Sequence, residues 1–207
     1  MNPGRTDGLR GRKRDVTEGG IRVIGLVEYP HLVKQNRVEE RFPIVTMDTH
    51  ATVLDMLGMH SFEDRPLDGE SLLPYLRGER KSRLGAIGWH GVFYLGSTNH
   101  VNGTFPYVCP NTSAAAEMGD IPVDFSTPFH QPQGAWSDDE MKLVMCRTQH
   151  TAPQRWNFYL YNLTADRAEQ IDLWRDERPT ALRMLDDFQA WQHSILKSQS
   201  NLGCTNP

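Results

Sequence analysis

Apolar side chains recur along this chain in patterns that predict both strands and helices. Residues 22–28 contain a nearly continuous, β-branched apolar run, typical of a strand covered on both faces in a parallel sheet. Residues 46–58 and 179–195 carry apolar side chains three or four positions apart, so each stretch predicts an amphipathic helix. Residues 141–146 and 157–163 alternate between two sets of side chains, which indicates two strands with distinct faces.

Shorter signals mark the ends of these elements and the connections between them. Thr46 is expected to cap the first helix, with Gly58 just beyond its last turn. Residues 71–77 predict a short helix that ends at a glycine, and residues 86–90 predict a further strand. Residues 96–135 lack any sustained period, so they are predicted to form one long irregular insertion.

The order of these elements places the chain in the α/β class, with two parts. The run of charges at residues 79–83 is typical of a surface linker, so the boundary is placed between residues 83 and 84. Residues 1–83 are expected to be the tail of an α/β domain. Residues 84–207 are expected to form a small α+β subdomain with antiparallel strands, the insertion at about residues 96–135 and a C-terminal helix.

A basic, glycine-punctuated loop at residues 9–20 precedes the first predicted strand. Lys13 supplies a compact positive charge, and Gly11, Gly19 and Gly20 allow positive φ angles or close approach of a ligand to the backbone. These residues alone leave two interpretations open. The loop is either an anion-binding site or, as is more common for short basic clusters, a solvated surface.

Composition and charge narrow the classes of function. The chain has 207 residues, of which 38% are hydrophobic, enough for a buried core. Residues 1–22 hold six basic and three acidic residues, so their net charge is +3. The rest of the chain therefore carries -7, and the net charge of the whole chain is -4. The negative total argues against a nucleic-acid protein, so contact of the basic arm with nucleic acid is the weakest hypothesis. No apolar run is long enough to predict a membrane span, and no secretory signal is visible.

Separate motifs carry a family resemblance. They are, in order, residues 9–23, 48–58, 64–78 and 160–166. Together they resemble the C-terminal third of a sulfatase, an arylsulfatase-like enzyme of the alkaline-phosphatase-like superfamily. The resemblance covers residues 5–90 and 136–196, and one departure is Ile24, where the family usually has proline. The resemblance therefore implies that residues 1–83 are the tail of the α/β sulfatase catalytic domain.

The resemblance implies hydrolysis of sulfate esters and one substrate contact in this chain. By position, Lys13 corresponds to the lysine that precedes the family's Glu-Gly-Gly-x-Arg turn and contacts the sulfate of the substrate. Glu18 would anchor this turn rather than act as a base. Arg12 and Arg14 would face solvent or a missing domain. Lys13 is thus the expected substrate-binding residue, and no catalytic residue is expected here.

The same resemblance implies cofactors whose ligands lie far upstream. The family uses a formylglycine nucleophile, made in a Cys/Ser-x-Pro/Ala-x-Arg motif, and a divalent ion, usually calcium. Cys109, Cys146 and Cys204 do not fit that motif, and the family's paired aspartates and Asp-Asn-Gly are missing. His90 and His100 lack a further ligand at suitable spacing, so no metal ligand is predicted. The chain is expected to be an incomplete C-terminal portion, inactive alone, that needs a missing N-terminal region.

An alternative from another class is a non-catalytic polyanion-binding or assembly module, in which the basic loop holds sulfated or phosphorylated polymers.

The cysteines allow at most one internal disulfide; Cys109 with Cys146 is the first pair to test, and buried free thiols are the alternative. N-glycosylation triplets begin at Asn102, Asn111 and Asn162. Together with the family they hint at a secreted or lysosomal parent without assigning a compartment.

Overall fold

The computed structural model describes residues 6–13, 15–32, 42–59, 67–90, 133–147 and 156–201. The chain forms two compact units: Met1–Arg22 together with Ile87–Pro207, and Val23–Ala86. This division lies between residues 86 and 87, and the domain boundary predicted between residues 83 and 84 stays a prediction. The first 22 residues, however, belong to the unit that holds the strands. The insertion predicted at residues 96–135 lies almost entirely outside the described residues.

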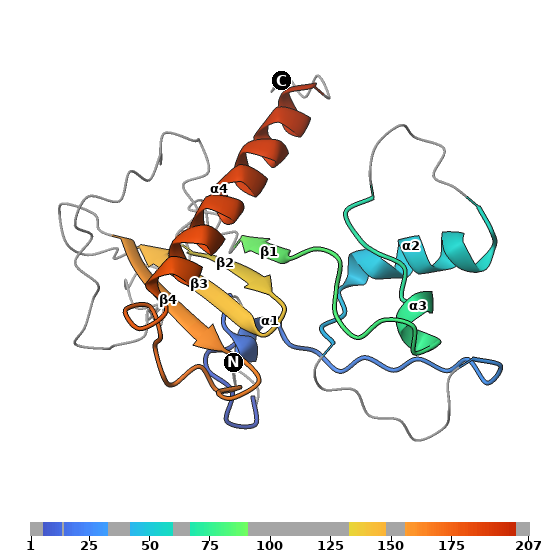
Figure 1. The fold of residues 1–207 in the computed structure, drawn as a ribbon, viewed down its shortest axis with the longest axis horizontal. Coiled ribbons are helices and arrows are strands. Elements are labelled where there is room, and N and C mark those ends of the chain that lie inside the picture. Colours follow the sequence, from blue (N-terminus) through green and yellow to red (C-terminus); the bar gives the residue numbers. More distant parts are fainter. Residues whose placement is uncertain are drawn as a thin grey trace, which may run out of the picture. The chain divides into compact units, whose positions relative to one another are not determined.

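A four-stranded antiparallel sheet forms the centre of the first unit (Figure 1). Its strands are β1 (Ile87–His90), β2 (Gln133–Asp138), β3 (Met141–Arg147) and β4 (Trp156–Asn162). They lie side by side in the order of the sequence, and a tight hairpin joins β2 to β3. The structure confirms the mixed helix and strand class, and it confirms the strands predicted at β1, β3 and β4.

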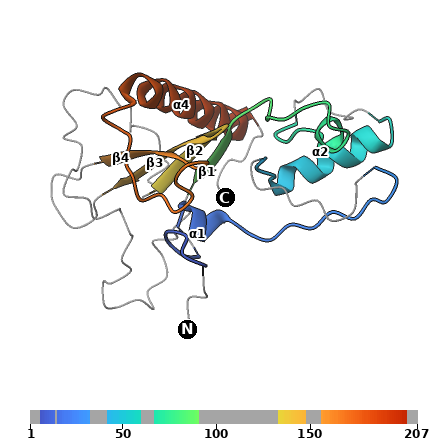
Figure 2. The same cartoon turned by 60° about the horizontal axis from the view of Figure 1, so that its bottom comes forward.

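Helix α4 (Arg178–Asn201) covers one face of this sheet (Figure 2). Its buried side chains are Ala181, Met184, Leu185 and Phe188. Alternate residues of the strands form the face beneath it: Trp136, Leu143, Met145, Phe158 and Leu160. The predicted C-terminal helix is therefore confirmed. Of its predicted apolar stripe, Leu185 and Phe188 are buried, Trp191 and Ile195 are half-buried, and Leu182 is 36% exposed.

Strand β2 was not predicted from the sequence, because its composition is determined by packing against the helix that covers it. Trp136 is its only large apolar residue, and Gly134 is typical of a turn rather than a strand. A Cβ atom on Gly134 would lie 2.7 Å from the ring of Phe188. The small residue leaves room for α4, so tertiary packing outweighs local strand propensity here.

The opposite face of the sheet packs against the N-terminal segment. Val16 is buried in a cluster with Ala135, Val144, Cys146, Tyr159 and Tyr161. Helix α1 (Glu18–Ile21) follows directly and lies on this side of the sheet in Figure 2. The Glu-Gly-Gly segment was predicted as a turn, but it forms one turn of helix, because the N–H of Arg22 donates to the Glu18 carbonyl at 3.0 Å.

The strand predicted at residues 22–28 is not formed. Val23, Ile24 and Leu26 are 86%, 99% and 88% exposed, although the run is as apolar as a buried strand. A strand needs a neighbour to satisfy its backbone N–H and carbonyl groups, and within the described parts of the chain none pairs with this run. The strand prediction for residues 22–28 was therefore wrong, because apolar periodicity alone does not supply a pairing partner.

The unit Val23–Ala86 holds helices α2 (Thr46–Met56) and α3 (Leu73–Leu76). Both were predicted, and α3 is shorter than expected. Thr46 is the first helical residue of α2 rather than its cap. Val45 occupies the cap position, and the Asp48 carboxylate accepts its backbone N–H at 2.9 Å, so a side chain inside the first turn satisfies the helix start.

The end of α2 agrees with the prediction, and its buried face agrees only in part. Gly58 has a φ of 63°, the left-handed conformation expected just after a helix. The predicted apolar stripe is Met47, Ala51, Leu54 and Leu57; Ala51 is buried and Leu54 half-buried, but Met47 and Leu57 are 45% and 65% exposed. The buried residues of the helix are Asp48, Ala51 and Thr52. Hydrogen bonds to polar groups, rather than apolar periodicity, decide which side of this helix is covered.

The aromatic packing around β1 leads to a pH prediction. The imidazole of His90 stacks on Trp191 with ring centres 4.9 Å apart, and burial lowers its pKa below the usual 6.5. The unfolded chain therefore binds this proton more tightly than the folded one. The contribution of neutral His90 to the free energy of unfolding should be fully present above pH 6.5 and should be lost as the pH falls below this value. Urea unfolding followed by tryptophan fluorescence at pH 7.5 and 5.5 measures this change.

A His90→Gln variant provides the comparison. It should lose less stability than the wild type between the two pH values, because a neutral amide takes up no proton. His50, exposed on α2 in the other unit, is the matched control, and His50→Gln should follow the wild type. Equal losses in the wild type and in His90→Gln would contradict the prediction.

Candidate anion-binding site

The predicted sulfate contact, Lys13, lies on an exposed turn of the basic loop at residues 9–20. The backbone N–H of Arg12 donates to Asp15 Oδ2 at 2.8 Å, and the N–H of Asp15 donates to the Arg12 carbonyl at 2.9 Å. These two bonds close the turn around Lys13. Its ammonium group is open to an anion from solvent, although salt screens a charge in this position.

The basic loop folds tightly on itself where it lacks side chains. Gly11 has a φ of 77°, and a Cβ atom on Gly20 would lie 2.1 Å from the carbonyl oxygen of Asp15. The N–H of Gly19 donates to the Arg10 carbonyl at 2.7 Å. The close approach that these glycines were expected to allow thus occurs between parts of the loop itself. Any larger residue at Gly20 would force its backbone apart.

Behind the loop, Lys142 of β3 lies between two buried carboxylates. Its Nζ is 2.8 Å from Glu18 Oε1 and 2.9 Å from Glu169 Oε1. Glu169 Oε2 also accepts the backbone N–H of Glu18 at 2.9 Å. Lys142 and Glu169 are 0% exposed and Glu18 is 4% exposed. The cluster joins α1, β3 and the segment after β4 in one network of charged contacts.

The charges of this cluster balance. Arg22 Nε lies 2.9 Å from Glu18 Oε2, so two cations meet two carboxylates. Burial raises the pKa of Glu169, while the charge of Lys142 and the hydrogen bond from the Glu18 N–H act in the opposite direction. Without the ammonium group, a charged Glu169 would be strongly unfavourable at this depth.

A second contact fixes the start of the loop. The guanidinium carbon of Arg10 is 5.7 Å from the centre of the Tyr161 ring, and Nη1 donates to the Tyr161 hydroxyl at 3.3 Å. Burial raises the pKa of Tyr161, so its hydroxyl stays neutral and accepts this bond. Arg10 and Glu18 therefore attach both ends of the segment that carries Lys13 to the same side of the sheet.

The structure separates residues that the sequence grouped together. Lys13 is exposed, Arg12 is half-buried and Glu18 is buried, while Arg14 lies outside the described residues. The role of Lys13 as a substrate contact stays a prediction. Sequence reasoning missed Lys142 and the glutamate opposite it. The available signal was a lysine in a strand at a position whose neighbours on the same face are Val144 and Cys146, since a lone charge on an apolar face requires a partner.

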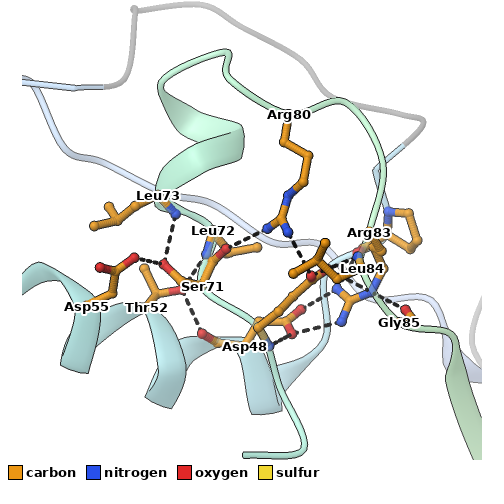
Figure 3. Close-up of polar contacts among 12 residues, drawn as sticks. Asp48, Thr52, Asp55, Ser71, Leu72, Leu73, Arg80, Arg83, Leu84 and Gly85 are labelled. Carbon is orange, nitrogen blue, oxygen red and sulfur yellow. Dashed lines mark hydrogen bonds and ion pairs between the residues drawn. The ribbon is translucent and has the colours of Figure 1, made fainter. Parts of the chain in front are cut away.

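A second charge network lies in the other unit and holds the segment after α3 against α2 (Figure 3). Arg83 donates to both carboxylate oxygens of Asp48, at 2.7 and 3.0 Å. Burial acts to raise the pKa of Asp48, but hydrogen bonds from Arg83 and from the backbone N–H groups of Val45 and Glu70 lower it overall. These donors occupy both carboxylate oxygens, so the Asp48 side chain stabilises the fold and offers no open ligand position.

The described residues do not fit the calcium ion that the family resemblance implies. Within those ranges no group of three or more histidine, cysteine, aspartate or glutamate side chains could hold a metal ion.

No helix in the part of the chain that the structure describes is long and apolar enough to cross a membrane. Cys146 is disulfide-bonded. Cys109 and Cys204 both lie outside the described ranges, so the predicted pairing with Cys109 stays a prediction.

Comparisons with known proteins point to one group of enzymes. No protein-family model matches the chain. It is 28% identical over 188 residues to the steryl-sulfatase of Mus musculus, a match that covers 88% of this chain and 27% of that protein. It is also 28% identical over 167 residues to arylsulfatase D of Homo sapiens, covering 78% and 25%. A shorter match of 70 residues to the steryl-sulfatase of Rattus norvegicus is 44% identical, covering 33% of this chain and 12% of that protein.

These matches concern only part of each relative, since the chain spans about a quarter of the length of the first two. Among solved structures, a phosphonate monoester hydrolase of Agrobacterium radiobacter shares 21% of its residues with the chain over 74% of this chain and 24% of its own. The TM-score of this match is 0.34.

Proposed function

Since the chain is similar to the C-terminal portion of sulfatases, we propose that it takes part in the hydrolysis of sulfate esters and that its basic loop holds the sulfate group. The observation that carries the proposal is the position of Lys13, which is exposed on a turn whose two flanks are attached to the sheet. A cation held in place by the fold suits an anionic group better than one on a mobile segment, because less order is lost on binding.

In this proposal the chain binds and orients the substrate and does not attack it. The Lys13 ammonium group donates charge-assisted hydrogen bonds to sulfate oxygens, and its charge stabilises the negative charge on those oxygens during the reaction. A formylglycine nucleophile would supply the attack on sulfur, and a calcium ion would help to stabilise the sulfate oxygens. Both would come from protein outside the described residues, so no step is assigned to this chain beyond binding and orientation.

The exposed apolar residues of the unit Val23–Ala86 support the proposal that this part of the chain works in contact with further protein. Val23, Ile24 and Leu26 are almost fully exposed, and Leu57, directly after α2, is 65% exposed. An unpaired apolar segment of this kind is typical of a surface that another strand or domain covers. We therefore propose that the chain alone binds sulfate weakly and does not turn over a sulfate ester.

Replacing Lys13 with alanine should weaken the binding of inorganic sulfate by the basic loop. We expect about a two- to fivefold increase in Kd, the size typical of one exposed charge contact. Sulfate titration followed by NMR, with the backbone amides of residues 9–20 as reporters, measures the change. Lys81→Ala, an exposed lysine in the other unit, is the control and should leave the affinity unchanged. Equal affinities for wild type and Lys13→Ala would overturn the role of Lys13.

A second candidate is a non-catalytic module that holds sulfated polymers. It is favoured by the attachment of the basic loop to this chain's own sheet through Arg10 and Glu18, because binding then needs no further domain. A heparin fragment in the same titration distinguishes the two candidates. Binding far tighter than that of inorganic sulfate, lost steeply with salt, would favour the module.

A further inference from the structure

We propose that Lys142 is a positioning residue for the basic loop: held between Glu18 and Glu169, it fixes α1 against the sheet and thereby sets where Lys13 lies. The inference rests on the proposed function, because the position of the loop matters for function only if Lys13 contacts an anion. It assigns a role to a lysine that lies 129 positions after Lys13, in strand β3.

A continuous series of contacts leads from Lys142 to the turn at Lys13. Lys142 Nζ lies 2.8 Å from the carboxylate of Glu18, the first residue of α1. The next residue, Gly19, donates its N–H to the Arg10 carbonyl at 2.7 Å. Because Lys13 lies between Arg10 and Gly19 in the sequence, this bond closes the segment that carries it. Fixing Glu18 therefore fixes one end of a closed loop.

The position of Lys142 demands a cation. Its side chain is 0% exposed, and the two carboxylates beside it are almost completely buried, so water cannot replace the ammonium group without opening the site. Among the described residues, a neutral side chain would leave Glu18 with Arg22 as its cation and would leave the buried Glu169 carboxylate with the Glu18 N–H but no cation. The simplest relief is for α1 to move away from the sheet, which takes the basic loop with it.

This anchor differs from the apolar one beside it. Val16 also packs the N-terminal segment against the sheet through its place in the apolar cluster, and burial of apolar surface does not depend on pH. The contribution of Lys142 depends on the two carboxylates being charged. In a variant that lacks the ammonium group, acid should restore the packing of α1, because burial raises the pKa of Glu169 and its protonation removes a charge from the site.

The test uses amide hydrogen exchange and sulfate binding on the 207-residue chain. In Lys142→Met, exchange at the amides of Gly19 and Gly20 should rise at least about tenfold relative to that of Leu143 in the sheet. Sulfate affinity, measured as for Lys13→Ala, should fall about as far as it does in that variant. Lowering the pH should narrow the difference in exchange between Lys142→Met and the wild type.

Matched variants separate positioning from loss of charge. Lys142→Arg, which keeps the cation, should restore part of the protection, and Lys81→Met should behave as the wild type. If Lys142→Met does not fold, Glu169→Gln takes its place, because it keeps the volume and an acceptor for the Glu18 N–H while removing one carboxylate charge. It should raise exchange at Gly19 by a smaller factor.

The outcomes distinguish this inference from the proposed function. Weaker sulfate binding with wild-type exchange at Gly19 and Gly20 would mean a simple charge effect and would overturn the inference. Unchanged exchange in both Lys142→Met and Glu169→Gln would overturn it as well. If Lys13→Ala leaves sulfate affinity unchanged, the proposed function fails, and the exchange data alone still decide whether Lys142 positions the loop.

Discussion

Replacing Arg83 with methionine is expected to destabilise the unit Val23–Ala86 by about 3–5 kcal/mol, the usual cost of removing one partner from a buried ion pair. Asp48 is 0% exposed, and Arg83 supplies a hydrogen bond to each of its oxygens. Methionine fills a similar volume but leaves a buried carboxylate without its cation. Arg83 Nη1 also donates to the Pro43 carbonyl at 3.0 Å, so a second acceptor loses its donor.

The choice of probe matters for this measurement. All five tryptophans of the chain lie outside residues 23–86, so their fluorescence reports on the other unit. Amide exchange within α2 should show the loss in Arg83→Met, while tryptophan-detected unfolding should stay close to that of the wild type. The pair Asp48→Asn with Arg83→Met should be less harmful than Arg83→Met alone, because no buried charge remains. Wild-type exchange in α2 of Arg83→Met would refute the prediction.

The second large effect is expected at Phe188, a fully buried side chain of α4 that packs on the sheet. It is 0% exposed, and its ring centre lies 5.5 Å from that of Trp191 and 6.2 Å from that of Trp136. Phe188→Ala should lower the free energy of unfolding of the first unit by about 3–5 kcal/mol, because the lost burial adds to the cost of the cavity left behind. Urea unfolding followed by tryptophan fluorescence measures this directly.

The control for Phe188 lies on the same helix. Leu182→Ala removes an apolar side chain that is 36% exposed and should cost much less. A Gly134→Ala change tests the same packing from the strand side, since its Cβ atom would meet the Phe188 ring at 2.7 Å. Gly134→Ala should be destabilising in the wild type and tolerated in Phe188→Ala, where the ring is gone. Additive effects of the two changes would argue against this contact.

Local sequence patterns predicted the elements in which the buried side chains follow the period of the helix or strand itself. The alternation in β3 and β4 identified both faces of the sheet, and the three- and four-residue spacing in α4 identified its buried side. The same reasoning failed where a distant group decides the outcome. Gly134 is small because Phe188 lies above it, and the covered side of α2 is set by the bond between Asp48 and Arg83.

The candidate site shows the same division. The sequence indicated the basic loop and Lys13 because the lysine, the glycines and the Glu-Gly-Gly segment are contiguous. It gave no indication that Glu18 would meet Lys142 and Glu169, which lie more than a hundred residues away and follow no shared period. Apolar residues 22–28 were predicted as a strand, but pairing is a property of two segments, and one segment cannot reveal its partner.

The bond between the backbone of Glu18 and the carboxylate of Glu169 spans 151 residues. On the ribosome, residues 6–22 emerge well before the strands that they pack against, so this segment must wait, largely unstructured, until β3 and the segment after β4 have been made. Closing so long a loop is slow and costs chain entropy, so docking of the basic loop should be among the last steps of folding. An early stall or truncation in synthesis would leave Lys13 without a fixed position.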